Sequence, residues 1–543
     1  MAILILNGER IEVPAGETLF AVADRRPAMA QEIASSCPRI GSCGECIVEV
    51  RSGHDALSDP TPQEAFLDTS AADSPSRFRL ACMARIVRPD AVVEVETFKR
   101  RLAIVTDGRP VHHPHDPWIT AADSAIFCDG TRIAQRTGDV LGLALDVGTT
   151  TVVLHLVDLL TGRTLARQAF ENPQKYGGSD VMHRISYDAS RPGQLHRSII
   201  ARVNHALRMM AADPLAIVGV AVAGNPTMRD LFFGLDVQTI GCKPFASRTQ
   251  LDWQAGLRPS TAIRATGEEL GLAVHPRACV YGLPLISNHV GADMAAVLMT
   301  LDAHTPDEPF MVVDIGTNTE AVIGLGERMI CVSCPAGPAF EGGRLGCGMI
   351  AVDGAITSLR RRDGSWRMEH LGDVPTRGIC GSGLIDLLAE LRTSGEMDEL
   401  GRFGDSRPHV PIVESSRLVF TRKDASELAQ AKGANGLGQL VLLRKLGITA
   451  AQIGRYYLAG AFANHIDLDN ARLIGLIPPV PDERILRLGN ASIEGAKAVL
   501  LSRTCRDRIE VLVQRIEHVE LEQEPDFFET FVEMTAFRPI PPE

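Results

Sequence analysis

The chain has 543 residues, 45 % of them hydrophobic and 22 % charged, which is ordinary for a soluble globular protein of roughly two to four domains. Its formal net charge of −12 argues against a nucleic acid or an anionic membrane surface as the main partner. The sequence shows neither a signal peptide nor a run of about 18 apolar residues that could span a bilayer, so we expect a cytoplasmic protein.

Residues 1–98 have the pattern of a small β-rich domain. The dipeptide Asn7-Gly8 separates two short apolar runs, a combination typical of a tight β-hairpin. We expect the hairpin strands over 3–6 and 10–13, a short helix over 18–25, and later strands over 46–51, 78–87 and 91–98. Together these elements describe a loop-rich domain of small size.

Four of the twelve cysteines fall in this first domain, at Cys37, Cys43, Cys46 and Cys82. Four thiolates are the ligand set of a [2Fe–2S] cluster, and Gly41 and Gly44 would let the loop backbone fold over its sulfides. The loop resembles that of plant and vertebrate ferredoxins, with the five-residue first spacing of the adrenodoxin-like branch. A structural zinc site is the main alternative, but such sites usually contain two C-x2-C pairs and this region has one.

Residues 99–140 lack clear periodicity, and their stretch His112–Trp118 is polar and rich in proline. This composition indicates a linker. A metal site at its three histidines (His112, His113 and His115) is a weaker interpretation, because no cysteine or carboxylate frame accompanies them.

From residue 141 onward, buried strands alternate with helices, which predicts an α/β architecture. The expected strands include 141–146, 151–158, 217–223, 310–314 and 456–459, and the expected helices include 382–392 and 424–432. We expect one ATPase domain over 141–543 with two lobes, roughly 141–305 and 306–543.

Two loops in this region share one plan, Asp146-Val147-Gly148-Thr149-Thr150-Thr151 and Asp314-Ile315-Gly316-Thr317-Asn318-Thr319. The Asp at the end of a buried strand can face Mg²⁺ and its waters, the Gly lets backbone amides approach a phosphate, and the Thr hydroxyls add donors. One copy would be a weak signal. Two copies on apolar strands predict a duplicated fold with a nucleotide in the cleft between its halves.

The pair of loops resembles the actin, sugar kinase and heat-shock chaperone ATPase superfamily. This resemblance implies a later, glycine-containing adenosine loop, and residues 456–464 fit it at Gly460. The glycine-rich turn 377–383, with Gly381 and Gly383, opens a helix and suits an anion. Asp293 is a further candidate cleft carboxylate, with a helix cap as an equally good interpretation. The P-loop motif G-x4-G-K-[ST] is absent, and so is a G-x-G-x-x-G motif after a strand.

With a ferredoxin-like module before this ATPase core, the chain resembles the reductive activators of corrinoid proteins over nearly its full length. Further segments carry the resemblance: 224–228, 281–287, 290–293, 336–343, 431–434 and 489–491. The C-terminal stretch 520–543 has no cysteine, so the [4Fe–4S] clusters of some relatives are not expected. The extra middle domain of other members is not expected either, because only the segment 99–140 separates the two modules.

The resemblance implies an α/β protein in which a β-grasp ferredoxin-like domain precedes a duplicated actin-like, ribonuclease H-like fold. It implies a [2Fe–2S] cluster, ATP and Mg²⁺ as cofactors, with Asp146 and Asp314 organising Mg²⁺ and the attacking water. The implied activity is ATP-dependent transfer of single electrons to the Co(II) corrinoid of a methyltransferase system, which restores Co(I). The implied partners are a corrinoid protein with its methyltransferase and a low-potential electron donor, and a homodimer stays open.

The other eight cysteines give no strong pattern. Cys331 and Cys334 have C-x2-C spacing and could form a second site with Cys347 and Cys380, but small buried thiols are common in cores. The remaining four are scattered without a partner pattern, at Cys128, Cys242, Cys279 and Cys505.

Three other functions stay open from the sequence. One is a small-molecule kinase of the same superfamily with a redox-sensing ferredoxin domain. Another is a nucleotide-gated electron carrier without turnover. A ferredoxin reductase is a third, although no flavin or nicotinamide loop is visible.

Overall fold

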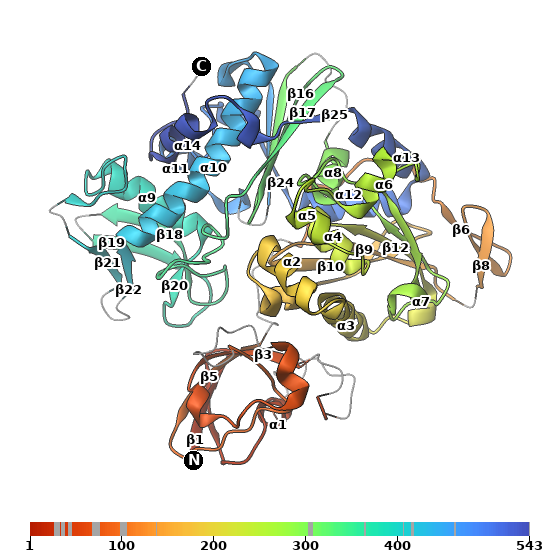
Figure 1. The fold of residues 1–543 in the computed structure, drawn as a ribbon, viewed down its shortest axis with the longest axis horizontal. Helices are drawn as coiled ribbons and strands as arrows, with labels where there is room; N and C mark the ends of the chain where they lie inside the picture. The colour runs from red at the N-terminus through yellow and green to blue at the C-terminus, as the bar shows by residue number, and fades with distance from the viewer. Residues whose placement is uncertain are drawn as a thin grey trace.

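The computed structural model describes residues 1–25, 33, 39–41, 46–67, 77–97, 106–136, 138–301, 308–362, 365–404, 407–413, 418–460 and 463–541. Figure 1 shows a small N-terminal domain beside two larger lobes. Within the described ranges, no helix is both long and apolar enough to cross a membrane.

The N-terminal domain is a five-stranded sheet with the order β2-β1-β5-β3-β4 and one helix. Its elements are β1 (Ala2–Leu6), β2 (Glu9–Val13), α1 (Leu19–Asp24), β3 (Ile47–Ser52), β4 (Phe78–Leu80) and β5 (Val92–Thr97). Asn7 and Gly8 both have positive φ, as a tight hairpin turn between β1 and β2 requires. The predicted hairpin, helix and strands are confirmed, except that 78–87 is a strand only at its start, because the chain turns after Leu80.

The first lobe is built on a six-stranded sheet of order β11-β10-β9-β12-β14-β13. β10 is antiparallel to both β9 and β11, and β12 is parallel to β9. The strands are β9 (Leu141–Val147), β10 (Thr151–Asp158), β11 (Thr164–Glu171), β12 (Ile217–Ala223), β13 (Ile263–Thr266) and β14 (Cys279–Gly282). The helices between them are α2 (Val181–Ser190), α3 (Gln194–Met209), α4 (Pro226–Phe232), α5 (Gln238–Gly241), α6 (Arg248–Gln254), α7 (Gly267–Leu270) and α8 (Ala292–Met299).

The second lobe repeats this plan in a sheet of order β24-β23-β15-β16-β17-β25. Here β16 is antiparallel to β15 and β17, and β23 is parallel to β15, so the duplication predicted from the two loops is confirmed. The strands are β15 (Phe310–Ile315), β16 (Thr319–Leu325), β17 (Arg328–Cys334), β23 (Arg455–Ala459), β24 (Ile485–Gly489) and β25 (Ile516–His518). The helices are α9 (Gly381–Thr393), α10 (Arg422–Leu446), α11 (Leu468–Leu473), α12 (Ala491–Leu501), α13 (Arg503–Leu512) and α14 (Phe527–Thr535).

Two small sheets complete this part of the chain. One has the order β19-β18-β20, and the other pairs β21 with β22. Their strands are β18 (Ala355–Arg362), β19 (Ser365–His370), β20 (Gly378–Ile379), β21 (His409–Val413) and β22 (Leu418–Thr421).

Helices α12 and α13 lie late in the sequence but belong to the packing of the first lobe. Ala496, Val499 and Leu500 of α12 are buried in one hydrophobic cluster with Ala144 of β9 and Ala221 of β12. A division of the ATPase region at residue 305 therefore does not separate the packing units, because the chain crosses back to the first sheet.

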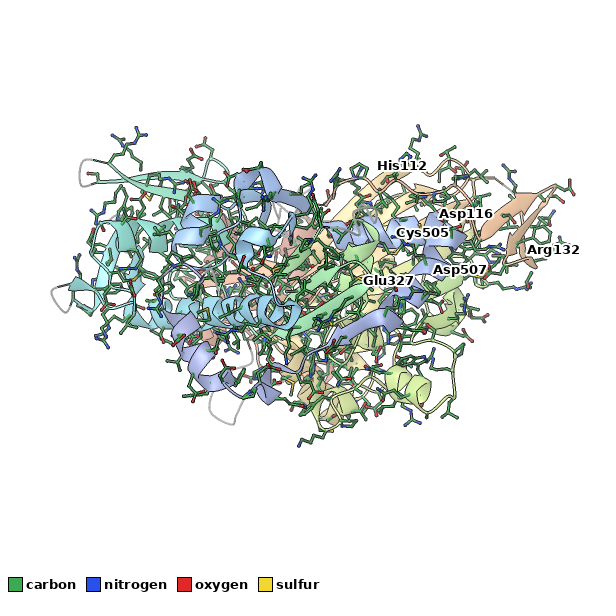
Figure 2. The ribbon with its side chains drawn as sticks, turned by 90° about the horizontal axis from the view of Figure 1, so that it is seen from above. His112, Asp116, Arg132, Glu327, Cys505 and Asp507 are labelled. Atoms are coloured by element: carbon green, nitrogen blue, oxygen red, sulfur yellow. A yellow bond between two sulfur atoms is a disulfide. The ribbon has the colours of Figure 1, made fainter. Side chains whose placement is uncertain are left out.

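The segment 99–140 needs a correction, because its described part is not only a linker. It contains a three-stranded sheet of β6 (Ile119–Ala122), β7 (Ala125–Cys128) and β8 (Thr131–Gln135). Trp118 is 1 % exposed and its indole N–H donates to the carbonyl of Val499, 2.9 Å away. Asp116 binds the start of α13, and Figure 2 shows it near Cys505. Apolar side chains thus fold this segment onto the first lobe. The histidines of the segment do not form a metal cluster among the described residues.

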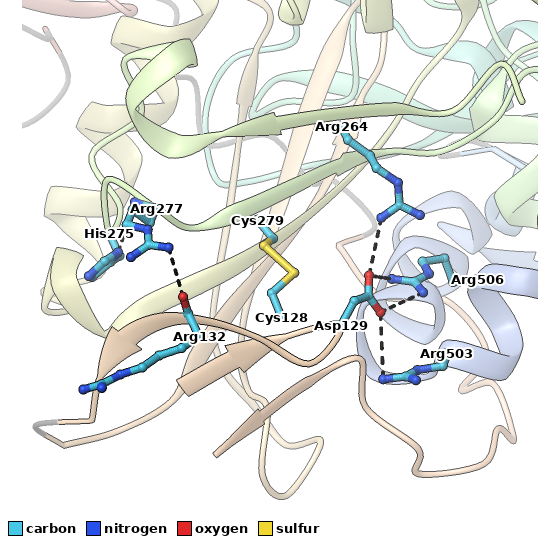
Figure 3. The surroundings of a disulfide bond; sticks show 9 residues. All are labelled: Cys128, Asp129, Arg132, Arg264, His275, Arg277, Cys279, Arg503 and Arg506. Carbon is cyan, nitrogen blue, oxygen red and sulfur yellow. Dashed lines mark hydrogen bonds and ion pairs between the residues drawn. A yellow bond between two sulfur atoms is a disulfide. The ribbon is translucent and has the colours of Figure 1, made fainter. Parts of the chain in front are cut away.

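A disulfide between Cys128 and Cys279 joins the small sheet to β14 (Figure 3). No partner pattern for these cysteines is visible in the sequence, because 151 positions separate them and only the fold brings them together. Beside the bond, Asp129 receives two hydrogen bonds from Arg506, at 2.8 and 3.0 Å, and lies 3.5 Å from Arg264. The ion pairs and the disulfide fix the β6–β8 sheet to the first lobe.

Candidate nucleotide cleft and iron–sulfur centre

A cleft with a cavity volume of about 510 Å³ lies between the two lobes. It is lined by both predicted phosphate loops, which follow β9 and β15 at equivalent ends of the two sheets. The predicted residues on its wall are Asp146, Gly148, Thr149, Thr150, Thr151, Asp314, Gly316, Thr317, Asn318, Gly381 and Gly460. Residues that are far apart in the sequence therefore meet in one cavity.

Two predicted residues do not line the cleft. Thr319 begins β16 with its side chain buried, and its hydroxyl has no hydrogen-bond partner within the described residues. Gly383 lies in the first turn of α9, where a Cβ would be 2.6 Å from the carbonyl oxygen of Ile356. The close approach of α9 to β18 explains this glycine by packing.

The first loop is held in place by a network of hydrogen bonds. Arg184, buried on α2, donates to the carbonyl of Thr149 at 2.7 Å. The Asn225 amide donates to the Thr149 hydroxyl at 2.9 Å. The Asn172 amide donates to the carbonyl of Gly148 at 2.8 Å. These contacts fix the backbone of the loop, so its amides and hydroxyls are positioned before a ligand arrives.

Asp146 is oriented by residues at the start of α12. The Asn490 amide donates to one carboxylate oxygen at 3.0 Å, and the Ser492 hydroxyl donates to the other at 2.9 Å. Burial raises the pKa of Asp146 and these two hydrogen bonds oppose the rise. The carboxylate therefore has a fixed orientation at the base of the cleft.

Three further carboxyl groups lie near Asp146, of which Asp293 and Asp314 are half-buried and Glu320 is buried. Burial raises the pKa of Asp314 to about 7, and the charges of Asp293 and Asp146 add to the rise. Burial, with the charge of Asp146, also raises the pKa of Asp293 to about 7. Burial, with the charges of Asp293 and Asp314, raises the pKa of Glu320 well above its usual value. A side-chain hydrogen bond joins Glu320 to Asp293 and opposes the rise in the pKa of Asp293.

This carboxyl cluster is a candidate site for Mg²⁺, because a divalent cation would offset the repulsion that raises these pKa values. Oxygen donors are the ligands that Mg²⁺ prefers, and it usually keeps several of its waters. Among the described residues, no three of these carboxylates are close enough to bind one ion directly. The donor set therefore fits a hydrated Mg²⁺ that also binds phosphate.

Asp293 lies in the first turn of α8 and is not its N-cap residue, which is Gly291. Its carboxylate still accepts a hydrogen bond from the backbone N–H of Met294 at 2.9 Å, and its side chain also lines the cleft.

The two phosphate loops meet at Glu341. Its carboxylate accepts hydrogen bonds from the hydroxyls of Thr150, at 2.5 Å, and Thr317, at 2.9 Å. The two hydroxyls are 3.4 Å apart. An anionic oxygen thus already lies between the hydroxyls that were predicted to bind phosphate.

Gly460 directly follows β23 and has φ +100°, a conformation that residues with a Cβ rarely adopt. A Cβ here would be 2.6 Å from the carbonyl oxygen of Ile315 and 2.9 Å from the Asp314 carboxylate. Glycine therefore allows β23 to approach the second phosphate loop closely.

A second group of candidate metal ligands, Asp107, His155 and Glu494, lies outside the cleft. Its carboxylates already have cationic partners, Arg167 for Asp107 and Lys497 for Glu494. The Nε2 atom of His155 donates to the carbonyl of Thr106, and burial lowers the pKa of this histidine to about 4. This balance of charge explains the cluster without a metal ion.

In the N-terminal domain, Cys46 and Cys82 bring their sulfur atoms to 3.2 Å of each other, and both side chains are buried. Cys46 lies directly before β3, and Cys82 lies in the turn after β4. Converging buried thiols fit two ligands of one iron of a [2Fe–2S] cluster. The other two predicted ligands, Cys37 and Cys43, lie outside the described residues.

The turn with Cys82 is held by Glu64. Its carboxylate accepts hydrogen bonds from the backbone of Leu80, at 2.9 Å, and from the buried Arg79, at 2.8 Å. Burial acts to raise the pKa of Glu64, but these donors and the backbone of Thr61 hold it below its usual value. A charged carboxylate therefore fixes the segment that carries the last thiol.

Sequence reasoning gave no role to Asn490, Ser492, Glu341, Asn225 or Glu320. Asn490 directly follows β24, and Glu320 follows the threonine that starts β16. The signal in the sequence that could have identified such residues is a polar side chain next to an apolar strand. Their partners could not be read from the sequence, because the contacts join segments that are distant along the chain.

Three family models match the chain side by side. Residues 4–87 match the 2Fe-2S iron-sulfur cluster binding domain, residues 141–306 match the RACo middle region, and residues 308–540 match the C-terminal domain of RACo, the ASKHA domain. The chain belongs to the RACo family. The model named for the ASKHA domain covers the second lobe, and the model for the RACo middle region covers the first lobe. A middle region is therefore matched at 141–306, although no extra middle domain was expected from the sequence.

Relatives and a solved structure agree with this assignment to the RACo family. The chain is 29 % identical over 434 residues to the corrinoid activation enzyme RamQ of Eubacterium limosum, covering 74 % of this chain and 71 % of that one. It is 25 % identical over 398 residues to the [Co(II) methylated amine-specific corrinoid protein] reductase of Methanosarcina barkeri, covering 69 % and 72 %. The structure of a reductive activator for corrinoid, iron-sulfur protein covers 99 % of both chains at 23 % identity, with a TM-score of 0.69, and shows the same fold.

Proposed function

We propose that this chain is an ATP-dependent reductive activator, which passes single electrons from a [2Fe–2S] cluster to the Co(II) corrinoid of a methyltransferase system and restores Co(I). The observation that carries the proposal is that one RACo-family chain contains both features. These are the converging Cys46 and Cys82 thiols and a carboxylate-lined cleft between duplicated lobes. The two similar relatives are named for corrinoid activation and corrinoid protein reduction.

A [2Fe–2S] cluster held by the predicted thiolates would supply the electrons, and its potential would explain the need for ATP. A plant-type [2Fe–2S] centre has a potential near −400 mV. The reduction of Co(II) to Co(I) needs a lower one. For one electron, a tenfold change in equilibrium corresponds to about 59 mV, so a gap on the order of 100–200 mV costs roughly 2–5 kcal/mol. ATP binding and hydrolysis can supply this free energy only through a conformational change of the protein. The conformations before and after this change must bind the partner with different affinities.

The residues of the cleft divide this work. Asp146, held by Asn490 and Ser492, would orient a hydrated Mg²⁺ ion. Asp314, whose pKa of about 7 lets it hold or release a proton near neutrality, positions the attacking water. Thr149, Thr150, Thr317 and Asn318 donate to phosphate oxygens, and Gly460 lets the adenosine approach the backbone.

The proposal includes a corrinoid protein with its methyltransferase and a low-potential electron donor as partners. It places the chain in the cytoplasm, without a nucleic acid or membrane partner. The methyl donor and a homodimer stay open.

The test is ATP hydrolysis by the anaerobically purified holoprotein with and without a Co(II) corrinoid protein. We expect the visible spectrum of a [2Fe–2S] centre and a hydrolysis rate that rises on addition of the Co(II) partner. The variant Cys82→Ser should lose the spectrum, which checks the ligand assignment.

Two outcomes would favour other functions. Phosphoryl transfer to a metabolite, independent of the cluster state, would identify a small-molecule kinase. Nucleotide binding without turnover, with or without the corrinoid protein, would identify a nucleotide-gated electron carrier.

A further inference from the structure

The N-terminal domain contacts both lobes of the ATPase region (Figure 1). On the first lobe, Lys175 donates to Glu49 of β3 at 2.9 Å. On the second lobe, Arg377 donates to Glu96 of β5 at 3.2 Å. One small domain is therefore bound to two bodies that enclose the nucleotide cleft.

Each of these two cations is close in sequence to the wall of the cleft. Lys175 also donates to Glu171 at 2.7 Å, and Glu171 lines the cleft at the end of β11. Arg377 precedes β20, and this strand leads directly to Gly381 and Ser382, which line the cleft at the start of α9. A shift of the cleft wall on either side therefore moves one anchor of the N-terminal domain.

The charges at the first anchor are balanced and sheltered from water. Glu49 has a side chain only 2 % exposed, and Lys175 is 23 % exposed. Burial acts to raise the pKa of Glu49, but Lys175, with Arg51 and Arg77, holds it below its usual value. Removing the lysine would leave a buried carboxylate with weaker compensation, so this contact contributes to docking more than an exposed pair does.

The anchored surface is connected to the cluster ligands. Glu49 lies on β3, which begins directly after Cys46. A second contact is made by Phe66, whose carbonyl accepts from Arg191 at 2.9 Å and from the hydroxyl of Tyr187. The Phe66 ring packs edge-on against Tyr176, with ring centroids 5.7 Å apart. Docking therefore fixes the position of the cluster-binding segment relative to the lobes.

A nucleotide cannot enter without disturbing this arrangement. The Glu341 carboxylate bridges Thr150 and Thr317 at the place where phosphate oxygens are expected. Phosphate repels Glu341 and Glu171, so the contact between the two loops and the pairing of Glu171 with Lys175 both change when Mg-nucleotide binds. Two anchors on two lobes cannot both keep their geometry when the lobes move relative to each other.

We propose that Lys175 and Arg377 dock the iron–sulfur domain across the two lobes, and that binding of Mg-nucleotide in the cleft releases this docking so that the cluster can reach its partner. The inference rests on the proposed function, because it requires nucleotide binding in the cleft. In this scheme Lys175 and Arg377 are positioning residues, which act through the carboxylates that they bind.

The test is hydrogen–deuterium exchange of the holoprotein, read by mass spectrometry, with and without Mg²⁺ and a non-hydrolysable ATP analogue. We expect the analogue to speed exchange in 47–52, 62–67 and 181–191 by about tenfold or more, as the loss of a charge-assisted hydrogen bond implies. Lys175→Met should show the fast rate without the analogue, and Lys175→Arg should behave as the wild type. Lys243→Met, at an exposed lysine of the same lobe, is the matched control.

The same data separate failure of this inference from failure of the proposed function. Protection of 146–151 and 314–319 by the analogue, without faster exchange in the docking segments, would overturn the release. A rate in Lys175→Met equal to that of the wild type would overturn its role as an anchor. If the phosphate loops gain no protection, nucleotide does not bind and the proposed function fails as well. Arg377→Met repeats the test from the other lobe, and the visible spectrum of each variant shows that its cluster domain is folded.

Discussion

The two phosphate loops have the same plan but different surroundings. Each follows a buried strand and turns into an antiparallel partner. Asp146 accepts hydrogen bonds from Asn490 and Ser492, whereas the Asp314 carboxylate accepts none from any described residue. Duplication thus supplied two equivalent aspartates, and the return of α12 to the first lobe made them different. One is a fixed acceptor, and the other is a titratable group facing the cleft.

The largest effect should follow from Asp314→Asn. Loss of the group that positions the attacking water should lower kcat for ATP hydrolysis by about 10²- to 10⁴-fold. Nucleotide affinity should fall less, by about tenfold, because one of the two titratable carboxyl groups can no longer ionise. Steady-state kinetics and calorimetry measure the two quantities. An equal loss of kcat in Asp146→Asn would contradict the division of roles.

Asp146→Asn should act mainly on binding. The change removes a negative charge that orients Mg²⁺, so the Mg²⁺-dependent affinity for nucleotide should fall by about 10- to 100-fold. Titration at several Mg²⁺ concentrations gives this number. An unchanged affinity would show that the first loop does not organise the ion.

The affinity for Mg-nucleotide should depend on pH through Asp314 of the second loop and Asp293 of α8. The pKa of Asp314 and of Asp293 is about 7, so below this pH each group holds a proton that Mg²⁺ must displace. Affinity for Mg-nucleotide should rise roughly tenfold for each group that must ionise as pH increases from 6 to 8. Calorimetry in buffers of different ionisation enthalpy should show proton release, reduced in Asp314→Asn. Binding that releases no protons and does not depend on pH would contradict these assignments.

The raised pKa values also set the stability of the nucleotide-free protein. An unfolded Asp has a pKa near 3.8, so the folded chain holds more protons between about pH 4 and pH 7. The contribution of these groups to stability is therefore present at low pH and is lost as pH rises through 7. Mg-nucleotide should raise Tm more at pH 8 than at pH 6.

The smallest effect should follow from Ser492→Ala, which removes one of the two donors to Asp146. We expect a loss of nucleotide affinity of about tenfold or less, because Asn490 still holds the carboxylate. Thr357→Ala is the control, at another residue of the cleft wall whose hydroxyl donates to the carbonyl of Glu369. A loss as large as that of Asp146→Asn would mean that orientation by α12, and not charge, dominates.

The sequence predicted the parts of this molecule that depend on local pattern. The hairpin at Asn7-Gly8, the strands before both Asp-x-Gly-Thr loops and the duplication follow from apolar periodicity and turn residues. The meeting of both loops in one cleft followed from their equal places on repeated strands. The family resemblance agrees with the models that match 141–306 and 308–540.

The remaining features depend on contacts between distant segments. The contact of Trp118 with α12 turned an expected linker into part of the first lobe. The partners of Asp146 lie on the same returning helix. Cys128 and Cys279 pair across 151 positions. In each case the local sequence around a residue does not identify its partner, because the partner is distant along the chain and only the fold brings the two together.

The central claim is that the cleft drives an electron transfer that the cluster cannot achieve alone. The direct measurement is the visible spectrum of a Co(II) corrinoid protein mixed anaerobically with the pre-reduced holoprotein, with and without Mg-ATP. We expect Co(I) to form with the wild type and Mg-ATP, and not to form without nucleotide or with Asp314→Asn. Equal formation of Co(I) in the absence of ATP would contradict this claim.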